Sequence, residues 1–212
     1  MKKPHFTKKD MDVLKEVGNI CAGNATVALA QILFKRIELQ IPTVEIVALE
    51  DVPELIDKNQ HPVIGIQMET LGAINGHVLL MFSQKSAYTL MEMLVGSTHK
   101  QRTKLITQIG ISSLKEIGNI VISSYLSTLS SLARLPVFPS CPQFTDGLPE
   151  AVIKSVFSGF GKKKQKLILI ETLFSEQLST VSGKFFIAFD SQSMKLILQA
   201  CKHTAKNYKK GK

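Results

Sequence analysis

The chain has 212 residues, of which 44% are hydrophobic, and it carries a formal net charge of +9. This hydrophobic content is sufficient for a globular core and excludes a disordered chain, and the uninterrupted apolar runs are too short to span a bilayer. The three cysteines are widely spaced, which excludes a disulfide framework and favours a reducing, cytoplasmic compartment.

The positive charge gathers near the two ends of the chain and around residues 162–166. Charge runs at ends and turns are usually only solvated. No aromatic stacking platform or groove-reading motif accompanies these lysines, so we expect no nucleic-acid partner. The basic balance fits better with steering of an acidic protein partner.

The first half of the chain predicts a long helix, a strand, a turn, a hairpin and another helix. Thr7 is expected to cap the long helix, with Asp10 at its third position, and the helix should run to about Leu33. The β-branched stretch Ile37–Leu49 predicts a strand near a sheet edge, because Pro42 interrupts it. The remaining elements are a short helical turn at Val52–Ile56, hairpin strands at Val63–Leu71 and His77–Phe82, and a helix from Ser83 to Leu94.

The second half repeats this order after a polar linker at Ser97–Thr103. The expected elements are a long helix to about Leu132, a Pro-rich stretch at Leu135–Pro142, strands at Lys166–Phe174 and Val181–Phe189, and a helix from about Ser191 to Cys201. A single hairpin is marginally stable, so the two halves should combine their strands. We predict an α+β fold in which two pseudo-symmetric α-β-β-β-α halves share a mixed or antiparallel sheet, with two long exposed helices.

The expected organisation is a single domain at residues 1–201, made of internal repeats at about 7–96 and 104–201. Residues 202–212 are expected to form a basic, disordered tail, because they lack apolar periodicity. Such a tail should be dispensable for folding and for chemistry.

One motif occurs twice, at an offset of 100 residues. Glu16 and Asn19 of the first copy recur as Glu116 and Asn119. Four further positions correspond at the same offset: Asp12 with Ser112, Gly18 with Gly118, Ile20 with Ile120 and Pro42 with Pro142. At about 100° per residue, one helix face carries the polar stripe Asp12, Glu16, Asn19 and Gly23, and the second copy carries Ser112, Glu116, Asn119 and Ser123. The apolar residues lie on a separate arc of each helix.

An isolated Glu and Asn on an exposed helix face is usually only a solvated pair, but the duplication favours a functional role here. Gly18 and Gly118 are expected to allow close approach of a neighbouring helix or of the partner, because glycine inside a helix is otherwise unfavourable. The histidines, cysteines and carboxylates show no ligand spacing, so we expect no metal site.

The duplicated pattern resembles the CheC-type phosphatases of bacterial and archaeal chemotaxis. Its order is Asp or Ser, three residues, Glu, two residues, Asn, 22 residues and Pro, and the resemblance extends from Asp10 to about Cys201. The relative CheX is a poorer match because it has one copy. The flagellar switch relatives carry additional terminal segments for which this chain has no room. The departures are small, with Ser112, Ser123 and Ser124 replacing Asp12, Gly23 and Asn24 of the first copy.

This resemblance implies a hydrolase that dephosphorylates the phosphoaspartate of the response regulator CheY. Asn19 and Asn119 would orient the attacking water, because a neutral carboxamide can do so without changing its protonation. Glu16 and Glu116 would dock the regulator through its active-site Lys. The secondary contacts with the substrate would come from Asp12, Ser112, Gly23 and Ser123.

The resemblance also implies the partners. The protein would need no cofactor of its own, since the bound regulator brings its Mg²⁺. CheD, a receptor-modifying deamidase, would be a second partner, and the protein would be a cytoplasmic monomer or a heterodimer with CheD. Two other functions remain open: a non-catalytic module that binds phosphorylated CheY or regulates CheD, and a component of the flagellar motor switch.

Overall fold

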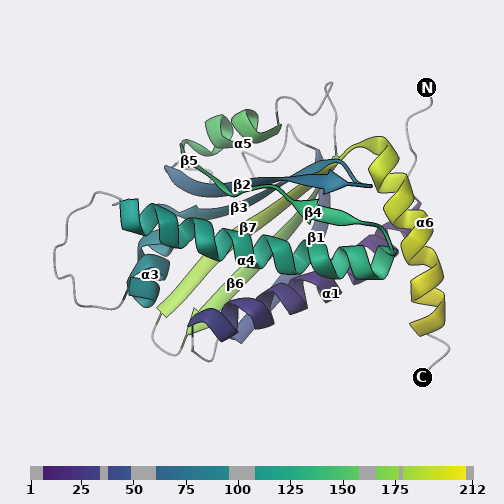
Figure 1. Cartoon of the computed structure of the whole chain (residues 1–212), viewed down its shortest axis with the longest axis horizontal. Helices are drawn as coiled ribbons and strands as arrows, with labels where there is room; N and C mark the ends of the chain where they lie inside the picture. The colour runs from purple at the N-terminus through teal and green to yellow at the C-terminus, as the bar shows by residue number, and fades with distance from the viewer. Residues whose placement is uncertain are drawn as a thin grey trace.

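The computed structural model of the chain describes residues 7–33, 38–48, 61–95, 108–157, 166–176 and 179–208, which form one seven-stranded sheet and its covering helices (Figure 1). The helices are α1 (Lys8–Leu33), α3 (Gln84–Val95), α4 (Gln108–Ala133), α5 (Pro149–Phe157) and α6 (Ser191–Tyr208). The strands are β1 (Glu38–Ala48), β2 (Val63–Gly72), β3 (Gly76–Ser83), β4 (Val137–Pro139), β5 (Gln143–Gly147), β6 (Lys166–Glu176) and β7 (Ser179–Phe189). The expected turn at Val52–Ile56 and linker at Ser97–Thr103 lie outside the described residues.

The two halves of the chain exchange their first strands. The sheet order is β1-β6-β7-β3-β2-β4, with β5 also paired to β2, and the pairs are antiparallel. The hairpins β2–β3 and β6–β7 meet at the centre through β3 and β7. Strand β1 of the first half pairs with β6, whereas β4 and β5 of the second half pair with β2. The predicted α+β fold with one shared sheet is therefore confirmed.

The two repeated prolines mark equivalent irregularities at opposite edges of this sheet. Pro42 lies where the pairing of β1 with β6 shifts register, between Gln40 and Thr43. Pro142 lies between β4 and β5, where the second edge strand is interrupted. Proline cannot donate a ladder hydrogen bond, so edges and bulges are the positions that tolerate it.

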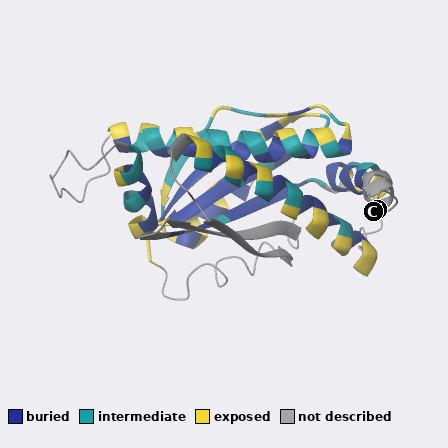
Figure 2. Cartoon of the chain, turned by 90° about the horizontal axis from the view of Figure 1, so that it is seen from below, coloured by how far each residue is buried: buried dark blue, intermediate teal, exposed yellow. Residues whose placement is uncertain are grey.

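Alternation of side chains along the strands builds two separate apolar layers. One face of the sheet packs against α1, α3, α4 and α6, and Ile66, Leu80 and Phe185 form a cross-strand row within that layer. The opposite face carries Leu79 and Phe186 under α5. Figure 2 shows the buried sides of the helices turned toward the sheet and the exposed sides turned to solvent.

Local capping explains where several helices begin. The Thr7 hydroxyl accepts a hydrogen bond from the Asp10 amide at 3.2 Å, and the Asp10 carboxylate accepts one from the Thr7 amide at 2.9 Å, as a reciprocal capping box requires. Ser83 caps α3 in the same sense, because its hydroxyl accepts from the Ser86 amide at 3.1 Å. The Asp190 carboxylate accepts from the Ser193 amide at the start of α6.

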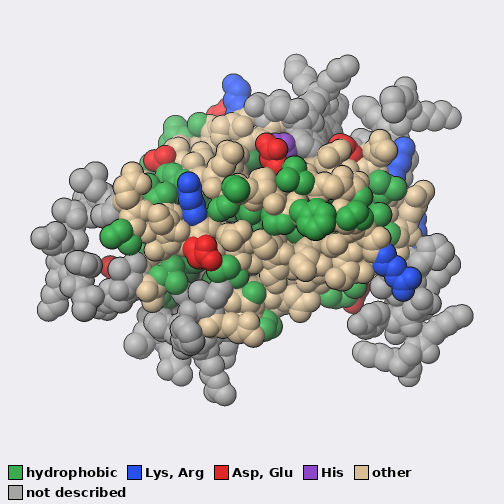
Figure 3. Space-filling view, in the orientation of Figure 1, with side chains coloured by type: hydrophobic (Ala, Val, Ile, Leu, Met, Phe, Trp, Pro, Cys, Tyr) green, Lys and Arg blue, Asp and Glu red, His purple; other side chains and the backbone are tan. Residues whose placement is uncertain are grey.

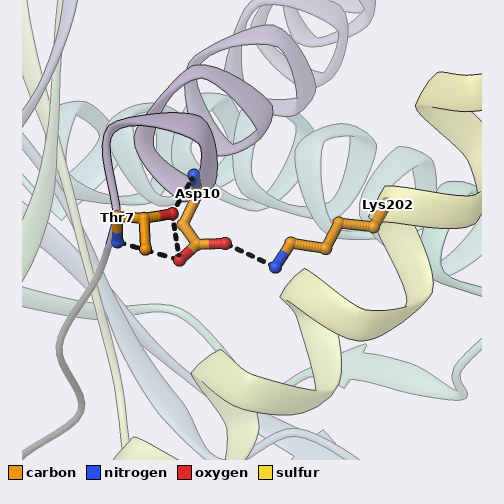
Figure 4. Close-up of polar contacts among 3 residues, drawn as sticks. All are labelled: Thr7, Asp10 and Lys202. Atoms are coloured by element: carbon orange, nitrogen blue, oxygen red, sulfur yellow. Dashed lines mark hydrogen bonds and ion pairs between the residues drawn. The ribbon is translucent and has the colours of Figure 1, made fainter.

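The last helix is longer than the sequence predicts. Helix α6 extends to Tyr208, so residues 202–208 are helical and do not belong to a disordered tail. Lys202 lies beside the start of α1, with its Nζ 2.5 Å from Asp10 Oδ1 (Figure 4). The ion pair between Lys202 and Asp10 stabilises the helical turn that carries the lysine. The apolar pattern of the sequence does not indicate this contact.

Candidate active site

The first copy of the motif lies on the outer face of α1. Glu16 and Asn19 are exposed, one turn apart, as the helical spacing predicts. Leu14, Val17 and Cys21 are buried on the other side of the same helix. The polar pair is therefore held on a surface that tertiary packing keeps rigid.

The second copy repeats this arrangement on α4. Glu116 is exposed and Asn119 is half-buried. Leu114, Ile117 and Val121 fill the layer beneath them. Each motif thus places a carboxylate and a carboxamide on a packed helix, at a surface that a second protein can reach.

Gly118 brings α4 close to the sheet. A Cβ built at this position would lie 2.8 Å from Ile66 Cβ and closer still to its Cγ2, which real Cβ atoms essentially never do. Gly118 therefore allows a close approach, but the neighbouring element is strand β2 and not a helix or a partner as expected. Gly18 is also buried.

The two motifs lie toward opposite ends of the interface between α1 and α4. Helices α1 and α4 pack side by side and run in opposite directions (Figure 1). Asn24 of α1 donates a hydrogen bond to the Thr128 hydroxyl of α4 at 3.1 Å, which fixes the register. At about 1.5 Å of rise per residue, Asn19 and Asn119 are then about 20 Å apart along the helix axes. A molecule that binds at one asparagine therefore does not need to contact the other asparagine.

The secondary positions differ between the copies. Asp12 and Ser112 are both exposed in the first turns of their helices. At the next position in each stripe, Ser123 donates a hydrogen bond to Asn119 Oδ1 at 3.3 Å, whereas Gly23 has no side chain to offer. The copies are thus alike in Glu and Asn and unlike in the residue one turn after Asn.

Two cysteines and one tyrosine with a raised pKa are buried in the core beneath the long helices. Burial raises the pKa of Cys21 well above its usual range and that of Cys201 to about 11. Burial, followed by the nearby cysteines, also raises the pKa of Tyr125. These groups stay protonated near neutral pH, so both thiols are poor nucleophiles.

Within the described residues, no group of three or more His, Cys, Asp and Glu side chains could hold a metal ion. Across the same part of the chain, no helix is long and apolar enough to cross a membrane. Figure 3 shows isolated charges on the face formed by the long helices, separated by uncharged and apolar surface.

Sequence reasoning missed a repeated lysine in the motif. Lys15 precedes Glu16, and Lys115 precedes Glu116, at the same offset of 100 residues. Lys15 is exposed and Lys115 is half-buried. On a helical wheel each lysine lies about 40° from the asparagine four residues later, on the side away from the glutamate. Each asparagine therefore has an acidic and a basic neighbour, and the repeat itself was the signal that could have revealed the lysines.

Comparison with known proteins links this geometry to one family. The model of the CheC-like family matches residues 10–46, which include the first motif and Pro42. The chain is 27% identical over 171 residues to the CheY-P phosphatase CheC of Bacillus subtilis strain 168, covering 80% of this chain and 82% of that protein.

Two further likenesses involve FliY proteins. The flagellar motor switch phosphatase FliY of Bacillus subtilis strain 168 is 21% identical over 138 residues, which are 65% of this chain and 36% of that protein. The crystal structure of Thermotoga maritima FliY superposes with a TM-score of 0.76 at 19% identity, covering 94% of this chain and 99% of the other, and so shares the fold. The chain is therefore similar to the CheC-like family, as the duplicated motif predicted.

Proposed function

We propose that this protein is a phosphatase that hydrolyses the phosphoaspartate of the response regulator CheY. The observation that carries the proposal is that two packed helices each present a glutamate and an asparagine, one turn apart, at the protein surface. This arrangement occurs in a chain that is similar over 80% of its length to a CheY-P phosphatase. Together they favour hydrolysis by a surface inserted into the regulator over an enclosed active site.

The chemistry asks little of the phosphatase. An acyl phosphate is already reactive, so the remaining task is to place a water in line with the phosphorus atom. A carboxamide can both donate to and accept from this water, and it stays neutral at every relevant pH. Asn19 and Asn119 are the residues that we assign to this step.

The carboxylates would dock the substrate. Glu16 and Glu116 lie one turn from the asparagines, where they can pair with the active-site Lys of the regulator. The regulator's own Mg²⁺ neutralises charge on the phosphoryl oxygens when it is bound. The secondary contacts with the regulator would come from Asp12, Ser112, Gly23 and Ser123.

We also propose CheD as a second partner, with this protein acting in the cytoplasm as a monomer or a CheD heterodimer. The support for CheD is the family resemblance alone. Pull-down of purified CheD by the full chain would test this part, and an absence of complex at micromolar concentrations would count against it. The phosphatase proposal does not depend on the outcome.

A role in the flagellar motor switch is the second candidate, because the fold is shared with FliY at a TM-score of 0.76. The FliY of Bacillus subtilis is itself named as a phosphatase, so motor assembly and hydrolysis are not mutually exclusive. Co-purification with motor proteins from cells would support assembly in the motor. A purely catalytic protein would remain outside that complex.

The direct test is phosphate release from phosphorylated CheY in Mg²⁺, with this protein at less than one tenth of the substrate concentration. Several turnovers per molecule would separate catalysis from sequestration, because a module that only binds can alter no more than a stoichiometric amount of substrate. Decay at the regulator's own rate in the presence of this protein would refute the proposal.

A further inference from the structure

The two motifs differ in how their asparagines are held. Ser123 donates a hydrogen bond to Asn119 Oδ1 at 3.3 Å. The equivalent residue of α1 is Gly23, and beyond its chain neighbours and the local helix backbone no atom lies within 4 Å of the place where its Cβ would be. Asn119 is also half-buried, whereas Asn19 is exposed. Asn119 is therefore restrained by Ser123, and Asn19 has no equivalent serine beside it.

The behaviour of Ser123 is unlike that of three other hydroxyl residues on the same helix. Ser113, Thr128 and Ser131 donate to the backbone carbonyl four residues earlier, at 2.9, 2.9 and 3.0 Å. This back-bonding is common for serine and threonine within helices. Ser123 instead donates to the side chain of the residue four positions earlier. Its hydroxyl is thereby committed to the motif and not to the helix backbone.

The bond selects an orientation of the carboxamide. The last torsion of an asparagine side chain is broad and nearly two-fold, so a free amide exchanges its oxygen and nitrogen positions readily. Occupation of one Oδ1 lone pair by Ser123 leaves Nδ2 and the second lone pair available to a water. At 3.3 Å the bond is long for a hydroxyl donor, so its effect should be orientation more than added stability.

We propose that Ser123 is a positioning residue for Asn119, and that the α4 site is the faster of the two because the α1 site has Gly23 at this place. The inference rests on the proposed phosphatase function. Ser123 acts through the asparagine, so it should affect the rate of the bound complex, kcat, with little effect on KM. Orientation of one small side chain accounts for about a twofold to fivefold change in rate.

The test uses proteins with one active site each. In the Asn19→Ala background, Ser123→Ala should lower kcat by about twofold to fivefold with KM nearly unchanged, and Ser123→Thr should restore most of it. In the Asn119→Ala background, Gly23→Ser should raise kcat by a similar factor, since a Cβ at this position meets nothing within 4 Å beyond its chain neighbours and the local helix backbone. Circular dichroism and thermal unfolding would verify that each variant is folded.

The outcomes separate this inference from the function on which it rests. If the wild-type protein does not accelerate phosphate release, the proposed function itself fails. If the wild type is active but Ser123→Ala leaves kcat unchanged, or changes only KM, the positioning role is refuted. An unchanged kcat for Gly23→Ser would likewise refute the claim that this serine distinguishes the two sites.

Discussion

Lys202 and Asp10 join the last helix to the first. Nζ of Lys202 lies 2.5 Å from Oδ1 of Asp10, and among the described residues this oxygen has no hydrogen-bond partner besides that ammonium (Figure 4). The other carboxylate oxygen accepts from the Thr7 amide and hydroxyl. The carboxylate therefore completes the cap of α1 and anchors α6, so its charge contributes to the stability of the fold.

Removal of the lysine should destabilise the protein in a pH-dependent way. Lys202→Met is expected to lower the free energy of unfolding by about 1 kcal/mol at pH 7, because the ammonium is partly exposed and its attraction is screened. The hydrogen bond from Lys202, followed by those from Thr7, lowers the pKa of Asp10 from 3.8 to about 2. A lowered carboxyl pKa stabilises the fold above about pH 4, and this contribution is lost as the pH falls through about 2.

Urea unfolding at several pH values would measure this effect. The difference between wild type and Lys202→Met should shrink as the pH decreases from 5 to about 2. Lys195→Met is the matched control, since Lys195 is exposed on the same helix. Equal losses for the two lysine variants, or a difference that does not depend on pH, would contradict the ion-pair explanation. A chain ending at residue 201 should also lose stability.

Substitution by alanine should have opposite effects on stability at Gly118 of α4 and at Gly23 of α1. Gly118→Ala is expected to destabilise the fold by about 1–3 kcal/mol, because its Cβ would overlap Ile66 in the sheet. Gly23→Ala should be neutral or stabilising by up to about 1 kcal/mol, because it adds a helix-favouring residue in open space. Thermal and chemical unfolding of the two variants would compare them directly. Destabilisation of both by the same amount would show that the close approach at Ile66 is not what requires glycine.

The repeated lysines should assist association with an acidic regulator. Replacement of both Lys15 and Lys115 by Met is expected to lower kcat/KM by severalfold at low ionic strength, and the difference should fade as salt screens the charges. Lys154→Met is the control, because Lys154 is exposed on α5, which covers the opposite face of the sheet. Steady-state phosphate release at two salt concentrations would measure the effect. A loss that persists at high salt would indicate a direct contact and not steering.

Much of the fold could be predicted from local sequence signals. Thr7 with Asp10 marked the start of α1, and the stretches Val63–Leu71 and His77–Phe82 marked the hairpin of β2 and β3. Pro42 correctly indicated an edge strand with an irregularity. Such features depend on residues close in sequence, so one sequence is enough to detect them.

The remaining features depend on contacts between distant residues. Strand β1 of the first half pairs with β6 of the second half, and β4 and β5 of the second half pair with β2 of the first half. No local sequence pattern relates these paired segments. The last turns of α6 were assigned to a tail, because the partner of Lys202 lies at the opposite end of the chain. At the start of α5, the sequence of Leu148, Pro149 and Glu150 resembles that of the short turn predicted at Val52–Ile56, and no helix was predicted there. Val152, Ile153 and Val156 nevertheless have the spacing of a buried helix face.

The site could be predicted in part from the repeat. The helical placement and surface position of the two Glu and Asn pairs follow from their spacing, and the structure shows both. The hydrogen bond from Ser123 to Asn119 was not predicted, because a serine four residues after an asparagine more often bonds to the backbone. The roles of these residues in hydrolysis stay a prediction.

We expect each long helix to carry a complete active site. Phosphate release from phosphorylated CheY in Mg²⁺ should be measured for Asn19→Ala, Asn119→Ala and the double variant, after folding of each has been verified. Because the two asparagines are about 20 Å apart along the helix axes, each single variant should keep substantial activity. The double variant should leave little beyond the regulator's own decay. Complete loss of activity in either folded single variant would contradict two independent active sites. Full activity in the double variant would contradict the roles assigned to Asn19 and Asn119.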